Sequence, residues 1–227
     1  MNYGFVPTYG TVAEAPAEVR ATFVRRVYGL FFVSVLVTIL VSAFCAQQAI
    51  AATLMPMLLP LLIVQLVLGI IMAFARRTTG LNIALFYLFS ATEGMIIGPL
   101  MTLVSRVAPG VPLEAAVLTG AVFAGLSLYA LQSGKDFSFL GGMLFVGLIA
   151  LVIGGLVMMF VHVAALYTLY CIIGVLIFSG YVLYDTSLIM RRLYPGEEIV
   201  GAISLYLDLI NLFWLILQLL MELQRRD

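Results

Sequence analysis

The absence of charge over two long stretches constrains the fold of this chain more than any other feature. No Asp, Glu, Lys or Arg occurs from Val27 to Ala75, nor from Phe137 to Tyr184, a stretch that includes the lone His162. A membrane-spanning helix needs about 20 apolar residues, so each stretch is long enough for two spans. Strands of a spanning barrel would alternate polar and apolar residues instead. The sequence therefore predicts an all-α, polytopic membrane protein.

The overall composition agrees with a membrane location. Hydrophobic residues make up 64% and charged residues 10% of the chain, whereas a soluble domain has about 25% charged residues. Eleven basic and eleven acidic residues balance each other, so the chain offers no basic surface for nucleic acid. Cys45 and Cys171 lie in apolar runs, and we expect buried free thiols there without a disulfide or a bound cofactor.

Seven hydrophobic segments follow one another, separated by polar or Pro- and Gly-containing breaks. They cover residues 25–46, 52–75, 81–104, 112–133, 137–160, 164–190 and 199–222. No linker is long enough to separate domains, so we expect residues 25–227 to form one seven-helix transmembrane domain. Residues 1–24 are polar and lack the basic start and cleavage site of a signal peptide. We expect them to form a short cytoplasmic tail.

The orientation follows from the Lys and Arg residues in the loops, which favour the cytoplasmic side. If all seven segments span, eight basic residues lie on the side of the N-terminal tail and three on the other side. This distribution predicts a multi-pass protein of the cell (inner) membrane with a cytoplasmic N-terminus. A re-entrant seventh segment would change the distribution to ten against one, whereas the length of that segment favours a full span. We expect seven spans.

The third segment contains two glycines at a spacing that suits helix packing. Gly94 and Gly98 are four residues apart and therefore lie on one face of the helix. A neighbouring backbone can approach closely where side chains are this small. We expect a close helix–helix contact at this face.

Three acidic residues lie well inside apolar segments: Glu93, Asp185 and Asp208. An isolated charge at the centre of a bilayer costs about 2.5–3.5 kcal/mol on insertion scales. Such residues are therefore rare in membrane spans and are candidates for function. They must be neutral, paired or open to a watery cavity.

The two aspartates are expected at a common depth. Asp185 lies ten residues before Pro195, and Asp208 lies twelve residues after Gly196. Because the two helices run antiparallel from this turn, their carboxyl groups come to similar heights in the membrane. On the seventh segment, Ser204 and Asn211 share one polar stripe with Asp208, and this stripe must face protein or water.

Two neighbouring carboxyl groups suggest a pH-sensitive gate. A pair of this kind tends to share one proton, and it repels when both groups are ionised. The same oxygens are suitable ligands for calcium. A structural alternative is that the pair only pins two helices together. Further candidates are Arg76 or Arg77 as a latch partner, and Glu93, Ser204 and Asn211 as pore or supporting polar groups.

Motifs of the common enzyme classes are missing. The chain has no Walker loop, dinucleotide-binding loop, zinc motif or serine-nucleophile elbow. An intramembrane aspartyl protease also uses two aspartates on neighbouring helices, and Tyr184 precedes Asp185 as in such proteases. The second aspartate of those proteases follows a Gly-x-Gly sequence, however, whereas Asp208 follows Leu-Tyr-Leu. We therefore expect no enzymatic activity.

Four motifs together resemble the Bax inhibitor-1 family, also called the transmembrane Bax inhibitor motif family. They are EGMIIGPLM at 93–101, KDFSFLGGMLF at 135–145, FSGYVLYDTSLI at 178–189 and AISLYLDLINLF at 202–213. The start of the first segment, VRATFVRRVYGLFFVSVLVTIL, is similar to the lifeguard-like branch. The resemblance runs from about Val19 to the last residue.

This resemblance implies a bundle of seven helices with the C-terminal helix at its centre. It also implies an association with pH-dependent calcium leak, in which Asp185 and Asp208 match the paired aspartates of the bacterial branch. An arginine linked to that pair is best matched by Arg77, with Arg76 as the alternative match. Some bacterial relatives are similar to regulators of a membrane-bound AAA protease.

From the residues and the resemblance together we derive one hypothesis and two alternatives. The hypothesis is a pH-sensitive calcium leak channel whose partners are the lipid bilayer, calcium and protons. The first alternative is a non-conducting regulator that binds a membrane protease or another membrane protein. The less favoured alternative is an intramembrane aspartyl protease.

Overall fold

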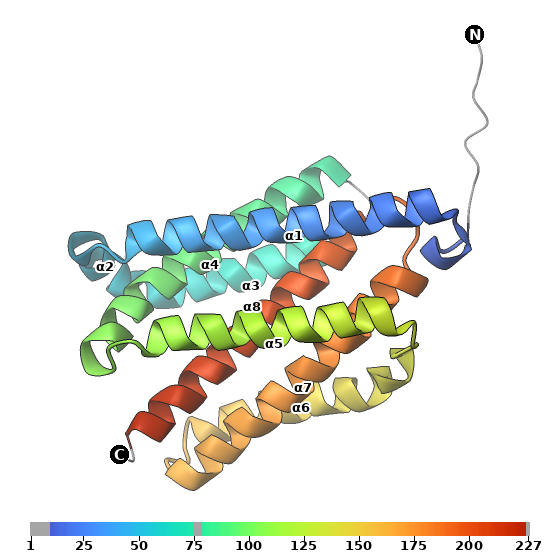
Figure 1. The fold of residues 1–227 in the computed structure, drawn as a ribbon. Coiled ribbons are helices and arrows are strands. Elements are labelled where there is room, and N and C mark those ends of the chain that lie inside the picture. The colour runs from blue at the N-terminus through green and yellow to red at the C-terminus, as the bar shows by residue number, and fades with distance from the viewer. Residues whose placement is uncertain (1–9, 75–78, 226–227) are drawn as a thin grey trace.

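The computed structural model describes residues 10–74 and 79–225, and within these ranges every regular element is helical (Figure 1). The helices are α1 (Ala17–Cys45), α2 (Gln48–Leu54), α3 (Leu58–Phe74), α4 (Thr79–Val107), α5 (Val111–Ser133), α6 (Gly141–Met158), α7 (Ala164–Arg191) and α8 (Glu198–Gln224). Short 3-10 turns, η1 (Val12–Glu14), η2 (Met55–Met57) and η4 (Ser138–Leu140), complete the regular structure.

Seven of the described helical stretches are long and apolar enough to cross a membrane, which confirms the predicted fold class. Six spans contain one α-helix each, and the second combines α2, η2 and α3. Pro56 lies in η2, where its missing N–H is tolerated more readily than in a helix interior. The last span, α8, is one uninterrupted helix of 27 residues, about 40 Å long at 1.5 Å per residue. This length suffices for a full crossing of a hydrocarbon core of about 30 Å.

The first helix begins before the start of the predicted hydrophobic segment. α1 starts at Ala17 and not near residue 25, because Ala, Glu and Arg are good helix formers. The segment before it is also packed against the bundle: Val12 is fully buried, and its N–H donates to the Leu193 carbonyl oxygen at 2.8 Å. Residues 12–24 of the predicted polar tail are thus largely ordered beside the turn between α7 and α8.

The C-terminal helix lies at the centre of the bundle, as predicted. α8 packs against α1, α4, α5 and α7, and in Figure 1 its red ribbon crosses between the α1–α3–α4 group and the α5–α6–α7 group. Half of its most apolar stretch is buried, compared with 11% for the span that contains α6. α6 is therefore peripheral, whereas α8 supplies much of the core.

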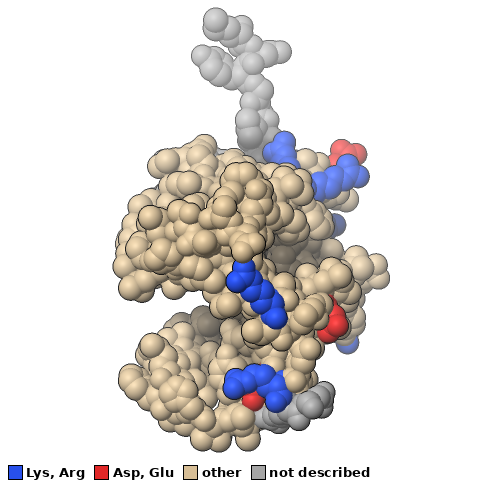
Figure 2. Space-filling model, turned by 90° about the vertical axis from the view of Figure 1, so that its left-hand side faces the viewer, with Lys and Arg blue, Asp and Glu red and all other residues tan. Residues whose placement is uncertain are grey.

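The outer surface is apolar, as a lipid-facing surface must be. Leu59, Phe145 and Leu176 are examples of large hydrophobic side chains that are more than 60% exposed. Figure 2 shows one end of the molecule, on which a few basic and acidic groups interrupt a largely uncharged surface. Exposed apolar area on this scale would not be stable in water, and a bilayer is the solvent that accommodates it.

Close contact between α1 and α4 confirms the expectation from the glycine spacing. A Cβ atom added at Gly94 would lie 2.7 Å from the backbone oxygen of Thr38, and one at Gly98 would lie 2.6 Å from that of Ser42. No ordinary side chain fits at such distances without movement of one helix. These two glycines therefore set the separation of α1 and α4.

Candidate functional site

A helical hairpin brings the two intramembrane aspartates to the same region of the bundle. α7 ends at Arg191, α8 begins at Glu198, and Gly196 in the intervening turn has a φ of 104°. This left-handed backbone conformation favours glycine. The two helices then pack closely: Gly174 of α7 leaves room for Leu215, because an added Cβ would lie 2.6 Å from its side chain.

Asp185 on α7 and Asp208 on α8 are neighbours on two helices that pack side by side. Asp208 is only 4% exposed, and Asp185 is partly exposed. Tyr181 lies one helical turn before Asp185 on α7. The hairpin thus places a buried acid and a partly exposed acid beside each other.

One oxygen of this pair has no partner among the described residues. Asp208 Oδ2 is buried and accepts no hydrogen bond from any described residue. Two neighbouring carboxylates repel each other, and a proton shared between them removes that repulsion. The arrangement can therefore exist as a bonded, singly charged pair or as a repelling, doubly charged pair.

The other predicted polar residues of α8 do not join the pair. Asn211 donates to the Leu207 carbonyl oxygen of its own helix at 2.7 Å. Ser204 lines a separate cavity described below. Arg76 and Arg77, the predicted latch partners, lie outside the described residues.

Glu93 lies at another place in the bundle. It is the middle residue of α4 and is 7% exposed. Its carboxylate accepts hydrogen bonds from Gln65 Nε2 of α3 at 2.8 Å and from Trp214 Nε1 of α8 at 3.0 Å. The sequence identifies Glu93 as an acid within a span. It does not identify these two partners, which are far from Glu93 in the chain.

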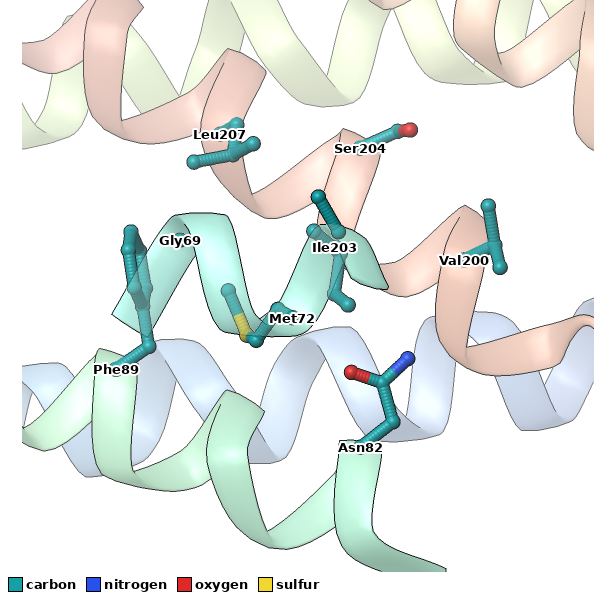
Figure 3. A pocket seen from close by; sticks show the side chains of 9 residues that line it. Gly69, Met72, Asn82, Phe89, Val200, Ile203, Ser204 and Leu207 are labelled. Carbon is teal, nitrogen blue, oxygen red and sulfur yellow. The ribbon is translucent and has the colours of Figure 1, made fainter. Parts of the chain in front are cut away.

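A cavity of about 180 Å³ lies between α3, α4 and α8 (Figure 3). The Asn82 side chain points from α4 toward it, is fully buried, and leaves both amide atoms without a hydrogen-bond partner among the described residues. Gly69, Met72, Phe89, Ile203 and Ser204 are among the lining residues. Sequence reasoning missed Asn82, although a lone amide at the start of an apolar segment is a usable signal.

The described residues do not supply a resident metal site around the aspartates. No group of three or more His, Cys, Asp or Glu within the described ranges is arranged to hold a metal ion. Calcium takes six to eight oxygen ligands, and two carboxylates provide at most four. A calcium ion in contact with Asp185 and Asp208 would therefore need further ligands to complete its shell.

The loop that precedes α6 is hydrogen-bonded to the C-terminal end of α7, close to Asp185. Ser187 Oγ accepts from the Phe137 N–H at 3.0 Å, and Arg192 donates to Ser138 Oγ at 2.7 Å. The Ser138 N–H donates to Asp136 at 2.9 Å and holds the pKa of that carboxyl group below its usual range. Movement of α7 away from α8 would therefore carry this loop with it or break these bonds.

The comparisons with known proteins cover nearly the whole chain. The family model described as "Inhibitor of apoptosis-promoting Bax1" matches residues 20–226. Protein lifeguard 4 of Mus musculus is 36% identical over 223 residues, which cover 96% of this chain and 90% of that protein. Bax inhibitor 1 of Schizosaccharomyces pombe is 34% identical over 221 residues, which cover 95% and 82% of the two chains.

A bacterial relative extends the comparison. An uncharacterized protein of Campylobacter jejuni is 32% identical over 209 residues, which cover 90% of each chain. The structure itself supplies seven candidate spans within the described residues and a central C-terminal helix. The chain belongs to the Bax inhibitor-1 family of multi-pass membrane proteins, also called the transmembrane Bax inhibitor motif family.

Proposed function

We propose that this protein is a pH-sensitive calcium leak channel of the cell membrane, gated by Asp185 and Asp208. The observation that carries the proposal is the placement of these two acids as neighbours on adjacent helices of a membrane bundle. Membership of the Bax inhibitor-1 family supports it, because that family includes pH-sensitive calcium leak channels. Loop charges support a cytoplasmic N-terminus, which puts the α7–α8 turn on the cytoplasmic side.

The gate works through the charge of the pair. With one shared proton, the two carboxyl groups hold α7 and α8 together and the cytoplasmic end of the bundle is closed. Loss of this proton leaves two negative charges, whose repulsion separates the helices. The same charges then attract a calcium ion and contribute oxygen ligands to it. Flux therefore rises with pH in this mechanism.

The cavity beside Asn82 is a suitable cytoplasmic entrance. It has room for several water molecules, and the Asn82 amide, which has no partner among the described residues, offers such water hydrogen bonds. Ser204, which lines the cavity, lies one helical turn before Asp208 on α8. We propose that water in this cavity brings protons and ions close to the pair.

Calcium flux in liposomes tests the channel function directly. Purified protein in vesicles loaded with a calcium indicator is expected to give a leak above that of protein-free vesicles, rising from acidic to alkaline pH. Flux equal to that of protein-free vesicles at every pH would refute the channel. The regulator alternative predicts this absence of flux together with a stable complex with a membrane-bound AAA protease. The protease alternative predicts cleavage of a membrane substrate that either Asp-to-Asn change abolishes.

Thiol labelling tests the watery entrance. In Ser204→Cys, the new thiol is expected to react with a charged, membrane-impermeant thiol reagent, because the cavity admits water. Leu128→Cys is the matched control. Leu128 is 53% exposed and lies near the C-terminal end of α5, so its thiol would face lipid and stay unreactive. Cys45 and Cys171 are buried and set the background. Equal labelling of the two variants, or none at residue 204, contradicts the entrance.

A further inference from the structure

A second buried carboxyl group joins three helices at a different depth from the aspartate pair. Glu93 of α4 accepts from Gln65 of α3 and from Trp214 of α8, one bond to each carboxylate oxygen. Trp214 lies six residues after Asp208, about 9 Å further along α8 at 1.5 Å per residue. Glu93 is therefore a separate site and not a third member of the pair.

The groups around Glu93 do not neutralise its charge. Among the described residues no Lys, Arg or His forms an ion pair with it. Gln65 and Trp214 are neutral, and the nearby Tyr206 of α8 carries no positive charge. The hydroxyl group of Tyr206 shares a hydrogen bond of 2.7 Å with the neutral Thr38 of α1. Because an unneutralised charge inside a membrane is costly, a proton is the ligand that this carboxylate lacks.

The Gln65 amide can serve both protonation states of Glu93. Its Nε2 donates to Glu93, whereas its Oε1 is buried and has no partner among the described residues. Rotation of the amide by half a turn exchanges these two atoms without moving either backbone. The rotated amide presents its oxygen to Glu93, where it accepts a hydrogen bond from a protonated carboxyl group. Trp214 still donates to the other carboxyl oxygen in this arrangement.

We propose that Glu93, Gln65 and Trp214 form a second proton-binding site, in which a proton taken up from water on Glu93 is accompanied by rotation of the Gln65 amide. The proton enters on the carboxyl oxygen that faces Gln65, and the negative charge at the middle of α4 disappears. Hydronium supplies the proton and becomes water, and the hydrogen bond donated by Gln65 Nε2 is replaced by one that Gln65 Oε1 accepts from the carboxyl group. The bundle thus carries a second site whose charge is set independently of Asp185 and Asp208.

The single tryptophan of the chain makes this proposal directly testable. Trp214 donates to Glu93 itself, so its fluorescence is expected to change sigmoidally as the pH of the purified protein is varied from about 4.5 to about 9. In Glu93→Gln, which preserves size and shape, this change is expected to be lost. The double variant Asp185→Asn/Asp208→Asn is the matched control, and it is expected to retain the change.

A second readout does not depend on tryptophan. Infrared difference spectra of the wild type between low and high pH are expected to contain the C=O band of a protonated carboxyl group. This band is expected to be missing in Glu93→Gln. Circular dichroism checks that the variant is folded. The proposal is overturned if wild-type fluorescence does not titrate, if the titration survives in Glu93→Gln, or if it disappears in the aspartate double variant. Failure of the calcium channel would leave all of these results unchanged.

Discussion

Replacement of Asp208 by Asn is expected to lower calcium flux at alkaline pH at least about tenfold and to remove its pH dependence, and Asp185→Asn should do the same. With one amide in the pair, two negative charges cannot arise, and the amide can donate a hydrogen bond to the remaining carboxylate. Two unit charges about 4 Å apart repel by about 4 kcal/mol at an effective dielectric constant of 20. Loss of this repulsion energy exceeds the 1.4 kcal/mol that corresponds to a tenfold change in flux.

The measurement is calcium entry into liposomes containing equal amounts of each variant, over a series of pH values. Glu114→Gln is the matched control: it also removes one carboxylate, but Glu114 is exposed in the first turn of α5, at the opposite end of the bundle from the α7–α8 turn. This control is expected to behave like the wild type. If both aspartate variants keep the wild-type flux and its pH dependence, Asp185 and Asp208 are not the gate.

Replacement of Gly98 by Ala is expected to destabilise the protein by about 1–3 kcal/mol, the usual cost of overpacking. The added methyl carbon would lie 2.6 Å from the Ser42 carbonyl oxygen and 2.8 Å from Cys45 Cβ, so α1 and α4 must move apart. Each kcal/mol corresponds to a loss of roughly 2–4 °C in Tm for a domain of this size. Thermal unfolding in detergent, followed by circular dichroism, measures the change.

Gly120→Ala provides the control for this substitution. Gly120 also lies inside a helix, α5, but an added Cβ there would meet nothing within 4 Å. Both substitutions share the gain in helix propensity of about 0.5–1 kcal/mol, so their difference isolates the contact between helices. An equal Tm for the two variants would mean that the α1–α4 contact is more adaptable than its geometry indicates.

Much of the fold is predictable from the sequence because the signals are local. A run of apolar residues long enough to cross a bilayer specifies a span wherever it occurs, and the bounds of the seven spans agree with prediction to within a few residues for most ends. The start of α1 is the exception. Hydropathy indicates where the apolar span begins, whereas the helix extends beyond it through Arg25 and Arg20 because the residues there are also good helix formers.

The partners of the buried polar groups are harder to predict. Counting residues from Pro195 gives the depth of each aspartate, but the direction of a side chain depends on rotation about the helix axis. That rotation is set by tertiary packing, such as the fit of Leu215 against Gly174. Glu93 illustrates the same limit, since Gln65 and Trp214 lie 28 and 121 residues away in the sequence.

The central position of α8 also has a consequence for biosynthesis. Of the seven spans it is the last to leave the ribosome, yet α1, α4, α5 and α7 all pack against it. Until it inserts, Glu93 is in the membrane without the hydrogen bond that Trp214 supplies, and Asp185 is without its neighbour Asp208. The nascent protein therefore passes through a stage in which its most polar interior faces are exposed to lipid. A chain truncated before Glu198 would remain in that stage and would be a substrate for membrane quality control.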